Sequence, residues 1–516
     1  MSLPAGWATA PLGEVVEILD SRRVPINSAE RETRQGAIPY YGATGQVGWI
    51  DDFLFDEELI LLGEDGAPFL DPAKPKAYMI AGKSWVNNHA HVLKARNGLL
   101  NRFLLHQLNC VDYHDYVSGT TRLKLPQAPM REIPMRIAPG PEQDRIVAEI
   151  EKQFTRLDDA VGALKRVQAN LKRYRASVLK AACEGRLVPT EAELARKEGR
   201  DYEPASELLK RILAERRAKW ESDQLQKMIA AGKPSKNEEW KNKYREPQPP
   251  ETSALSQLPE GWVWASVEQL STKVVDGVHK KPDYVPTGVP FVTVKNLTAG
   301  PGISFRDLNY VTQADHQEFT KRANPERGDI LVSKDGTLGV IRAIRTGEVF
   351  SIFVSVAMIK PVLTELTDYL ELALSSPQVQ IQMVPKGSGL QHIHLEDLRE
   401  DCIPLPPIAE GERIVTAAAR HLSIIDSLER DVGKRFLQAR ALRNSILHSA
   451  FSGKLVPQDP HNEPASVLLD RIRAERARAQ EQKQKTPKAA NGTLRVNGQR
   501  RRRVAELAQG VSPGKG

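Results

Sequence analysis

Residues 142–183 read EQDRIVAEIEKQFTRLDDAVGALKRVQANLKRYRASVLKAAC, and residues 410–451 read EGERIVTAAARHLSIIDSLERDVGKRFLQARALRNSILHSAF. In both stretches apolar residues recur every three or four positions, which places one narrow apolar seam along a helix. A shift of 268 residues brings the two seams into register. The seam residues are Ile146, Ile150, Leu157, Val161, Leu164 and Leu171 in the first helix, and Ile414, Leu422, Ile425, Leu428, Val432 and Ile446 in the second.

A helix of this length spans about 60 Å, at 1.5 Å per residue. It is too long to fold back into one small core, so its seam needs a partner helix. The other copy is the obvious partner, and we expect the two helices to pair as a coiled coil.

The repeat is larger than the helices. Leu3-Pro4-Ala5-Gly6-Trp7 returns as Leu258-Pro259-Glu260-Gly261-Trp262, and Gly185-Arg186-Leu187-Val188-Pro189 returns as Gly453-Lys454-Leu455-Val456-Pro457. Further along, Glu203-Pro204-Ala205-Ser206 returns as Glu463-Pro464-Ala465-Ser466. A period of about 260 residues indicates a duplicated domain and not a solenoid.

The stretch before each helix predicts a globular lobe of mixed α/β (α+β) class, and the two lobes differ far more than the helices do. Gly and Pro punctuate short apolar runs in both lobes, as in a loop-rich β structure. The predicted organisation is a first lobe (1–140), a long helix (141–190), a charged helix with its connector (191–257), a second lobe (258–407), a second long helix (408–457), a short charged helix (458–483) and a disordered basic tail (484–516).

Several local elements are predicted within this frame. Strands are expected at 59–62 and 91–93 in the first lobe, and at 291–294 and 330–333 in the second. Helices are expected at 98–109, 205–228 and 364–374, whereas the prolines between 126 and 141 predict an extended approach to the first long helix.

Composition bounds the protein class. The 516 residues suffice for several domains, and no apolar run is long enough to span a bilayer. The N-terminus lacks a signal-peptide pattern, and three widely spaced cysteines suggest neither disulfides nor zinc, so we expect a cytoplasmic protein. The net charge of +8 favours a nucleic-acid partner. The lobes carry 14 Lys and Arg against 16 Asp and Glu (1–140), and 14 against 18 (258–407), so they must bind DNA through local clusters.

The sequence contains none of the common catalytic motifs. The chain has no Asn/Asp-Pro-Pro-Tyr signature of adenine methyltransferases, no P-loop and no GxSxG. His89 and His91 have no third ligand at a sensible spacing, and in a strand they would share one face and pack or hydrogen-bond. The sequence therefore predicts a protein with no catalytic residues and no metal site.

Gly-flanked loops that mix amides, hydroxyls, bases and aromatics remain as candidate DNA contacts. Arg and Lys bond guanine edges, Asn and Gln bond adenine edges, and all of them bond phosphates. For any single residue, an ordinary surface role is an equally good interpretation. The candidates are Tyr40, Tyr41, Lys83, Asn87, Asn88, His89, Arg122 and Lys124 in the first lobe, and Lys280, Lys281, Lys295, Asn296, Lys334, Lys386, Gln391 and His392 in the second.

Over roughly residues 1–480 the chain resembles the specificity subunit of type I restriction–modification systems. The resemblance rests on the two Leu-Pro-x-Gly-Trp openings, the divergent lobes and the repeated helices that end in Gly-Arg/Lys-Leu-Val-Pro. The segments at 327–337 and 62–67 also look like recurring phrases of the family's recognition domains. The charged insertion at 190–257 and the basic tail depart from the simplest family members.

The resemblance implies that each lobe is a target recognition domain that reads one half of a split, asymmetric double-stranded DNA sequence. The long helices would pair antiparallel, set the spacing of the half-sites and dock two modification subunits. Those subunits would bind S-adenosylmethionine and flip the target adenine out of the duplex, and restriction subunits would add ATP- and magnesium-dependent translocation and cleavage. The chain itself would hold no cofactor, would not touch a membrane, and would work in a bacterial or archaeal cytoplasm.

Two alternatives stay open at the level of sequence. One is a coiled-coil scaffold whose lobes bind proteins, and the other is an enzyme that acts alone through an unrecognised motif. A preference for a bipartite DNA site separates the first hypothesis from both.

Overall fold

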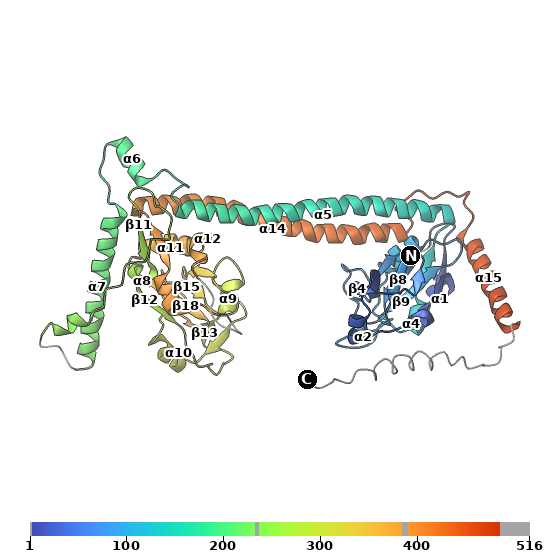
Figure 1. Cartoon of the computed structure of the whole chain (residues 1–516), viewed down its shortest axis with the longest axis horizontal. Coiled ribbons are helices and arrows are strands. Elements are labelled where there is room, and N and C mark those ends of the chain that lie inside the picture. The colour runs from blue at the N-terminus through green and yellow to red at the C-terminus, as the bar shows by residue number, and fades with distance from the viewer. Residues whose placement is uncertain (1–2, 233–236, 384–390, 486–516) are drawn as a thin grey trace, which may run out of the picture. The chain divides into compact units, whose positions relative to one another are not determined.

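The computed structural model describes residues 3–232, 237–383 and 391–485, and it divides into two compact units. Unit 1 contains the first lobe, the first half of one long helix and the last half of the other (residues 1–162 and 435–516). Unit 2 comprises residues 163–434. Each unit therefore joins one lobe to parts of both long helices, which are labelled α5 (Gly140–Cys183) and α14 (Ile408–Phe451) in Figure 1.

The first lobe is built on two four-stranded sheets and one strand pair. The sheets have the strand orders β2-β9-β6-β7 and β4-β3-β8-β5, and β1 pairs with β10. Their bounds are β1 Ala8–Pro11, β2 Val16–Ile18, β3 Ile38–Gly42, β4 Gly45–Ile50, β5 Phe55–Asp56, β6 Leu59–Gly63, β7 Ala77–Ile80, β8 Lys83–Val86, β9 Ala90–Ala95 and β10 Pro134–Ile137. The helices are α1 Leu12–Val15, α2 Ser28–Thr33, α3 Asn101–Leu108 and α4 Gln127–Glu132, with a 3-10 turn at Asp20–Arg22.

The second lobe repeats this plan with a smaller second sheet. The strand orders are β12-β18-β15-β16 and β14-β13-β17, and β11 pairs with β19. The strands are β11 Val263–Ser266, β12 Ser271–Asp276, β13 Val289–Val292, β14 Asn309–Val311, β15 Ile330–Ser333, β16 Ile341–Ala343, β17 Ser351–Ile352, β18 Val356–Pro361 and β19 Cys402–Leu405. The helices are α8 Val267–Leu270, α9 Val294–Thr298, α10 Gln313–Thr320, α11 Thr367–Leu374, α12 Pro377–Gln380 and α13 Leu395–Glu400, with a 3-10 turn at Thr364–Leu366.

Helices also follow each long helix. After α5 come α6 (Glu191–Glu198), α7 (Ala205–Ala230) and a 3-10 turn at Glu239–Lys243, and after α14 comes α15 (Ala465–Lys485). The predicted charged helices are thus confirmed, but α6 was missed. Arg216 of α7 donates to Ser271 O at 2.9 Å, so the charged insertion lies on the second lobe. No helix among the described residues is long and apolar enough to cross a membrane.

Each lobe meets its long helix through the same joint. Trp7 Nε1 donates to Glu142 Oε1 at 3.0 Å in unit 1, and Trp262 Nε1 donates to Glu410 Oε1 at 3.0 Å in unit 2. Both carboxylates are buried, and burial raises the pKa of each above its ordinary value. The Trp of each Leu-Pro-x-Gly-Trp opening therefore connects its lobe to the start of a long helix.

The repeated Gly-Arg/Lys-Leu-Val-Pro segments close the joint from the other side. Gly185 and Gly453 end the long helices with φ values of +63° and +71°, in the left-handed region that favours glycine. A Cβ at Gly185 would meet Pro259 Cγ at 2.6 Å, and one at Gly453 would meet Pro4 Cγ at 2.3 Å. Glycine is needed here both for the turn and for the close approach.

The long helices pair antiparallel in each unit. In unit 1, Arg145 bonds Pro457 O, and further along α5 Asp158 pairs with Arg443, which also lies 4.2 Å above the Phe154 ring. In unit 2, Arg175 pairs with Asp426 at 2.5 Å, and Arg413 bonds Pro189 O. A shift of 268 residues converts Asp158 to Asp426 and Arg175 to Arg443, so the two ion pairs are equivalent. The predicted internal two-fold duplication is thus present in side-chain contacts.

Most of the predicted seam is buried, with one error. Ile146, Ile150, Ile414 and Ile425 are fully buried, and Leu157, Leu171, Val432 and Ile446 are nearly so. Val161, Leu164 and Leu422 are half-buried. Leu428, which the spacing places on the seam between Ile425 and Val432, is 45% exposed.

The helices and strands predicted from buried apolar runs are confirmed. The predictions near prolines and near the first residues of helices are partly wrong. Strands β6, β9 and β15 and helices α3, α7 and α11 lie where they were expected. The predicted extended approach at 126–141 is confirmed at strand β10 but wrong over α4. Pro126 caps α4 and Pro129 lies in its first turn, where no backbone N–H is required. The strand predicted at 291–294 ends at Val292, because Thr293 caps helix α9. The predicted disordered tail lies outside the described residues, except that α15 extends to Lys485.

Candidate nucleic-acid interface

In the first lobe, four chain segments meet at one end of the β2-β9-β6-β7 sheet. The turn after β6 contains Glu64, whose N–H donates to His89 O at 2.8 Å, just before β9. The carbonyl of Glu64 accepts from Leu125 N at 2.7 Å, and Asp65 forms an isolated bridge with Lys124. The loop after β2 is the fourth segment. We call this group, formed by residues 20–23, 64–66, 87–89 and 122–125, the first reading end.

The second lobe has the same backbone arrangement at the end of its β12-β18-β15-β16 sheet. Lys334 N donates to Ser355 O just before β18, and Ile393 N donates to Lys334 O, both at 2.9 Å. Asp335 bridges to His392 as Asp65 bridges to Lys124. The Gly that follows each Asp, Gly66 and Gly336, has a φ near +73° in both turns (+73° and +72°). We call residues 276–281, 334–336, 353–355 and 391–394 the second reading end.

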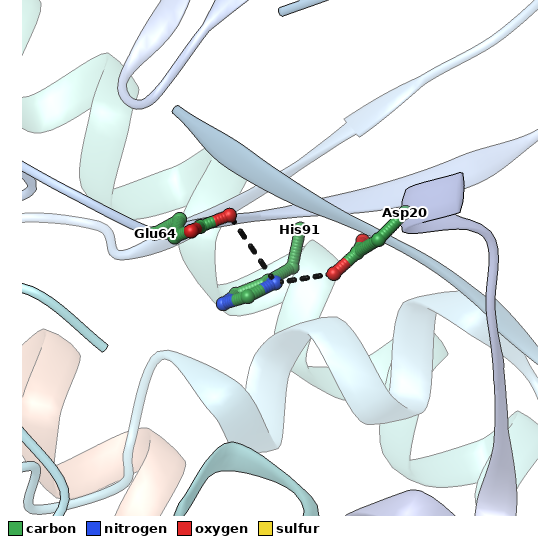
Figure 2. A group of neighbouring side chains, drawn as sticks. All are labelled: Asp20, Glu64 and His91. Atoms are coloured by element: carbon green, nitrogen blue, oxygen red, sulfur yellow. Dashed lines mark hydrogen bonds and ion pairs between the residues drawn. The ribbon is translucent and has the colours of Figure 1, made fainter. Parts of the chain in front are cut away.

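A buried charge network underlies the first reading end. Figure 2 shows the His91 ring between Asp20 and Glu64, with Nδ1 at 2.7 Å from Asp20 Oδ2 and 3.7 Å from Glu64 Oε2. The other ring nitrogen lies 2.8 Å from Leu125 O. Both ring nitrogens therefore lie within hydrogen-bond distance of an oxygen atom. Arg23 donates to Glu64 Oε2 at 2.7 Å.

Asp20 is the centre of this network. Burial by itself raises the pKa of Asp20, but hydrogen bonds from His91, Val92 N and Gln127 outweigh it and hold the pKa below its ordinary value. Val92 N donates to Oδ1 at 2.9 Å, and Gln127 Nε2 donates to Oδ2 at 2.8 Å. The carboxylate is therefore charged near neutral pH.

Asp20, Glu64 and His91 also present three ligand atoms within 4.8 Å of one another, as a metal site would. Arg23 already neutralises this group, because its guanidinium bonds Glu64 and lies 3.5 Å from Asp20. A cation would have to displace an arginine whose side chain is only 13% exposed. We therefore interpret the group as an ion-pair network.

The second reading end is organised around Asp276 instead. Its Oδ2 lies 3.0 Å from Lys334 Nζ, and its Oδ1 lies 3.1 Å from His279 Nε2 and 3.2 Å from Arg322 Nε. Burial raises the pKa of Asp276, but the hydrogen bonds from Arg322, Lys334 and His279 outweigh it and lower the pKa overall. The carboxylate is 3% exposed, whereas Arg322 and His279 are 50% and 63% exposed.

The structure brings many predicted contact residues together. In the first lobe, Asp65 pairs with both Arg122 and His89, the latter at 3.1 Å. Asn87 Oδ1 accepts from His89 N at 2.8 Å, and Asn87 N donates to Tyr41 O at 3.1 Å. The first reading end and its edge therefore contain Tyr41, Asn87, Asn88, His89, Arg122 and Lys124, and the second contains Lys280, Lys281, Lys334, Gln391 and His392.

Other predicted residues lie elsewhere. Tyr40 is 1% exposed and its hydroxyl donates to Ile26 O. Asn296 is 1% exposed, lies in the first turn of α9, and its Oδ1 accepts from Thr293 N, so both are framework groups in this structure. Lys83 lies at the start of β8, with its ammonium 4.8 Å above the Phe53 ring, and Lys295 is exposed on α9. Lys386 lies outside the described residues. Whether any of these side chains touches DNA stays a prediction.

Sequence reasoning missed the buried carboxylates and some of their partners. Asp20, Arg23, Asp276 and Arg322 carry the charge networks, and none was among the predicted residues. The sequence carries no motif for them: Asp276 ends strand β12, whereas Asp20 begins a 3-10 turn two residues after β2.

Known proteins match this architecture. The type I restriction modification DNA specificity domain matches twice, over residues 4–166 and 265–431. A Haemophilus influenzae protein named type I restriction enzyme specificity subunit S.HindORF215P is 36% identical over 137 residues, or 27% of this chain and 34% of that protein. The EcoKI specificity subunit of Escherichia coli K12 is 21% identical over 515 residues, covering 92% of this chain and 96% of that subunit.

A solved chain of a type I restriction–modification system shares the fold, with a TM-score of 0.57 at 15% identity, over 88% of this chain and all of that one. The two domain matches fall on the two lobes and the long helices that follow them, in agreement with the duplication found in the structure. This chain belongs to the family of DNA-specificity subunits of type I restriction–modification systems.

Proposed function

We propose that each lobe reads one half of a bipartite, asymmetric sequence in double-stranded DNA. One observation carries this proposal: the two reading ends share a backbone arrangement but present different side chains on it. Glu64 corresponds to Lys334, Lys124 to His392, and His91 to Ala357. Because side-chain donors and acceptors distinguish base edges, equal frames with different groups suit two different half-sites.

The long helices are proposed to set the distance between half-sites and to dock two modification subunits. Their repeated joints and equivalent ion pairs support this, since two identical partners require two equivalent surfaces. Each helix has 44 residues and spans about 65 Å at 1.5 Å per residue. The joints have the same side chains in both units, whereas the side chains at the two reading ends differ.

The chemistry is proposed to belong to partner subunits. Modification subunits would bind S-adenosylmethionine and methylate an adenine that has been flipped from the duplex. Restriction subunits would add ATP- and magnesium-dependent cleavage. This chain would supply recognition and geometry only. The family membership favours this function over a scaffold whose lobes bind proteins.

The test is to express the chain with its modification subunits in a host without other adenine methyltransferases, and to map methylated adenines across the genome. We expect one motif with two short specified halves separated by a fixed number of unspecified base pairs. Modification subunits alone serve as the control and should leave no such motif. A contiguous motif, or methylation without sequence preference, would contradict the proposal.

A further inference from the structure

We propose that Asp20 and Asp276 are positioning residues, each a buried carboxylate that holds the cationic side chains of its reading end for one half-site. This inference rests on the proposed function, because it assigns a role within DNA reading. It concerns residues that no motif marks and that do not themselves face solvent.

The two carboxylates occupy equivalent places. Asp276 is the last residue of β12 and pairs with Ala357 of β18. In the first lobe, Ile18 of β2 pairs with Leu93 of β9, and Leu19 N bonds Val92 O, so Asp20 continues the same register and lies beside His91. Both residues therefore lie at or just beyond the end of an edge strand, β2 or β12, next to the reading end.

In the second lobe, Asp276 contacts two cations and a histidine from three separate segments. Lys334 comes from the turn after β15, His279 from the loop after β12, and Arg322 from just beyond α10. Lys334 is 12% exposed, and its ammonium group lies 3.0 Å from Asp276 Oδ2. Arg322 and His279 also contact Asp276, but they expose half or more of their side chains. The carboxylate fixes the inner side of a cationic surface whose outer side is free to meet phosphates or base edges.

In the first lobe, Asp20 does the same through a relay. It holds His91, whose ring bonds Leu125 O, and it holds Gln127 directly. The segment fixed in this way carries the exposed Arg122 and Lys124. Asp20 thus positions cations that it does not touch.

Removing the negative charge leaves the cations in place without their partner. A buried charge that loses its counterion is strongly disfavoured, so Lys334 would turn toward water and Arg322 would lose its fixed orientation. Preorganised donors lose both affinity and discrimination when they become mobile.

Asp329 offers a matched control in the same lobe. It is a buried Asp that pairs with Lys360 at 2.8 Å, and it precedes Ile330 at the opposite end of β15 from the second reading end. Asp329→Asn removes a similar ion pair from the same sheet but leaves the reading end intact. This variant distinguishes an effect on the stability of the second lobe from an effect on base discrimination.

The experiment uses the full chain in complex with its modification subunits. For wild type, Asp276→Asn, Asp20→Asn and Asp329→Asn, we would measure methylation rates on a set of duplexes carrying every single base change in both half-sites, together with thermal unfolding. Asp276→Asn should lower the rate on the cognate duplex roughly tenfold or more and flatten discrimination in one half-site only. Asp20→Asn should do so in the other half-site, and Asp276→Glu should restore part of the discrimination.

Asp329→Asn should lower the unfolding temperature and keep the base discrimination of both half-sites. If Asp276→Asn fails to fold, Arg322→Gln removes the anchored exposed cation while Lys334 still pairs with the carboxylate, and it should relax the same half-site. The inference is overturned if wild type shows a bipartite site and Asp276→Asn, or Arg322→Gln in its place, discriminates as wild type does. It is also overturned if Asp329→Asn relaxes the same half-site as Asp276→Asn. A wild type with no bipartite preference would overturn the proposed function itself.

Discussion

At the scale of single residues, the chain uses buried acidic groups for two different purposes. Glu142 and Glu410 accept the indole N–H of a tryptophan and lock the lobes to the helices. Asp20 contacts Arg23 and His91 at the first reading end, and Asp276 contacts Lys334 at the second. The first pair repeats in sequence because the joint is common to both lobes, whereas the partners of the second pair differ between the lobes, as the proposed reading of two different half-sites requires.

Asp401 is a buried acidic group of another kind. It directly precedes β19, its carbonyl accepts from Val267 N, and it is 4% exposed. Burial, together with the charges of Asp397 and Glu400, raises its pKa to about 7. Because the folded state binds this proton more tightly than the unfolded state, the stabilising effect of the proton is fully present below the unfolded pKa near 3.8 and is lost as pH rises through about 7.

We therefore expect the free energy of unfolding of the second lobe to fall between about pH 4 and pH 7, by about 1.4 kcal/mol for each pH unit in this range, and to level off above it. Asp401→Asn keeps a neutral side chain and should remove this slope. Hydrogen exchange of the β11 and β19 amides at several pH values measures it. In Asp397→Asn the slope should move to lower pH, and an unchanged slope in Asp401→Asn would show that another group titrates.

Residue identities also show how far the sequence could predict the site. Lys334, Lys124 and His392 were predicted as DNA contacts because they lie in Gly-flanked polar loops, and the structure places them at the reading ends. Asp20 was missed because its partner His91 belongs to a strand 71 residues away, and only the pairing of β2 with β9 brings them together. Tyr40 was misjudged because the alternation of a strand decides which of two adjacent tyrosines faces the core, and here Tyr40 does.

At the scale of elements, the helix pair was predicted within two residues at each start, at Gly140 and Ile408, and its ends at Cys183 and Phe451 were predicted correctly. Periodicity suffices for this, because one apolar seam over 44 residues has no other explanation in a chain with ordinary hydrophobic content. Leu428 shows the limit. An α-helix drifts relative to a 3.5-residue repeat, so a residue that fits the local spacing can turn away from the seam.

The spacer role predicts the result of paired insertions. Seven residues added after Gly162 of α5 and seven after the equivalent Arg430 of α14 add about two turns to both helices and preserve the seam. We expect a longer gap between unchanged half-sites, read from the methylated motif. Seven residues added to α5 alone break the match between the ion pairs Asp158–Arg443 and Arg175–Asp426, and should lower assembly with modification subunits. An unchanged gap in the paired variant would rule out the helices as the ruler.

At the scale of the whole molecule, the duplication explains why some contacts repeat in both units while the side chains of the reading ends differ. Joints, helix ends and ion pairs repeat, so the two units have equivalent surfaces. The reading ends keep the backbone and change the side chains. The lobes are weakly acidic by composition, so attraction to DNA without regard to sequence is expected to be modest, and binding is expected to depend on local cations and on partner subunits.

The most direct test of this account is an exchange of the second lobe. Residues 263–407 would be replaced by the corresponding part of another family member with a different target, which keeps the joint formed by Trp262 and Glu410. Methylated adenines would then be mapped for both chains in the presence of the same modification subunits. The account predicts that one half-site changes to that of the donor, while the other half-site and the gap stay the same. A change in both half-sites, or in neither, would contradict the claim that each lobe reads its own half of the target.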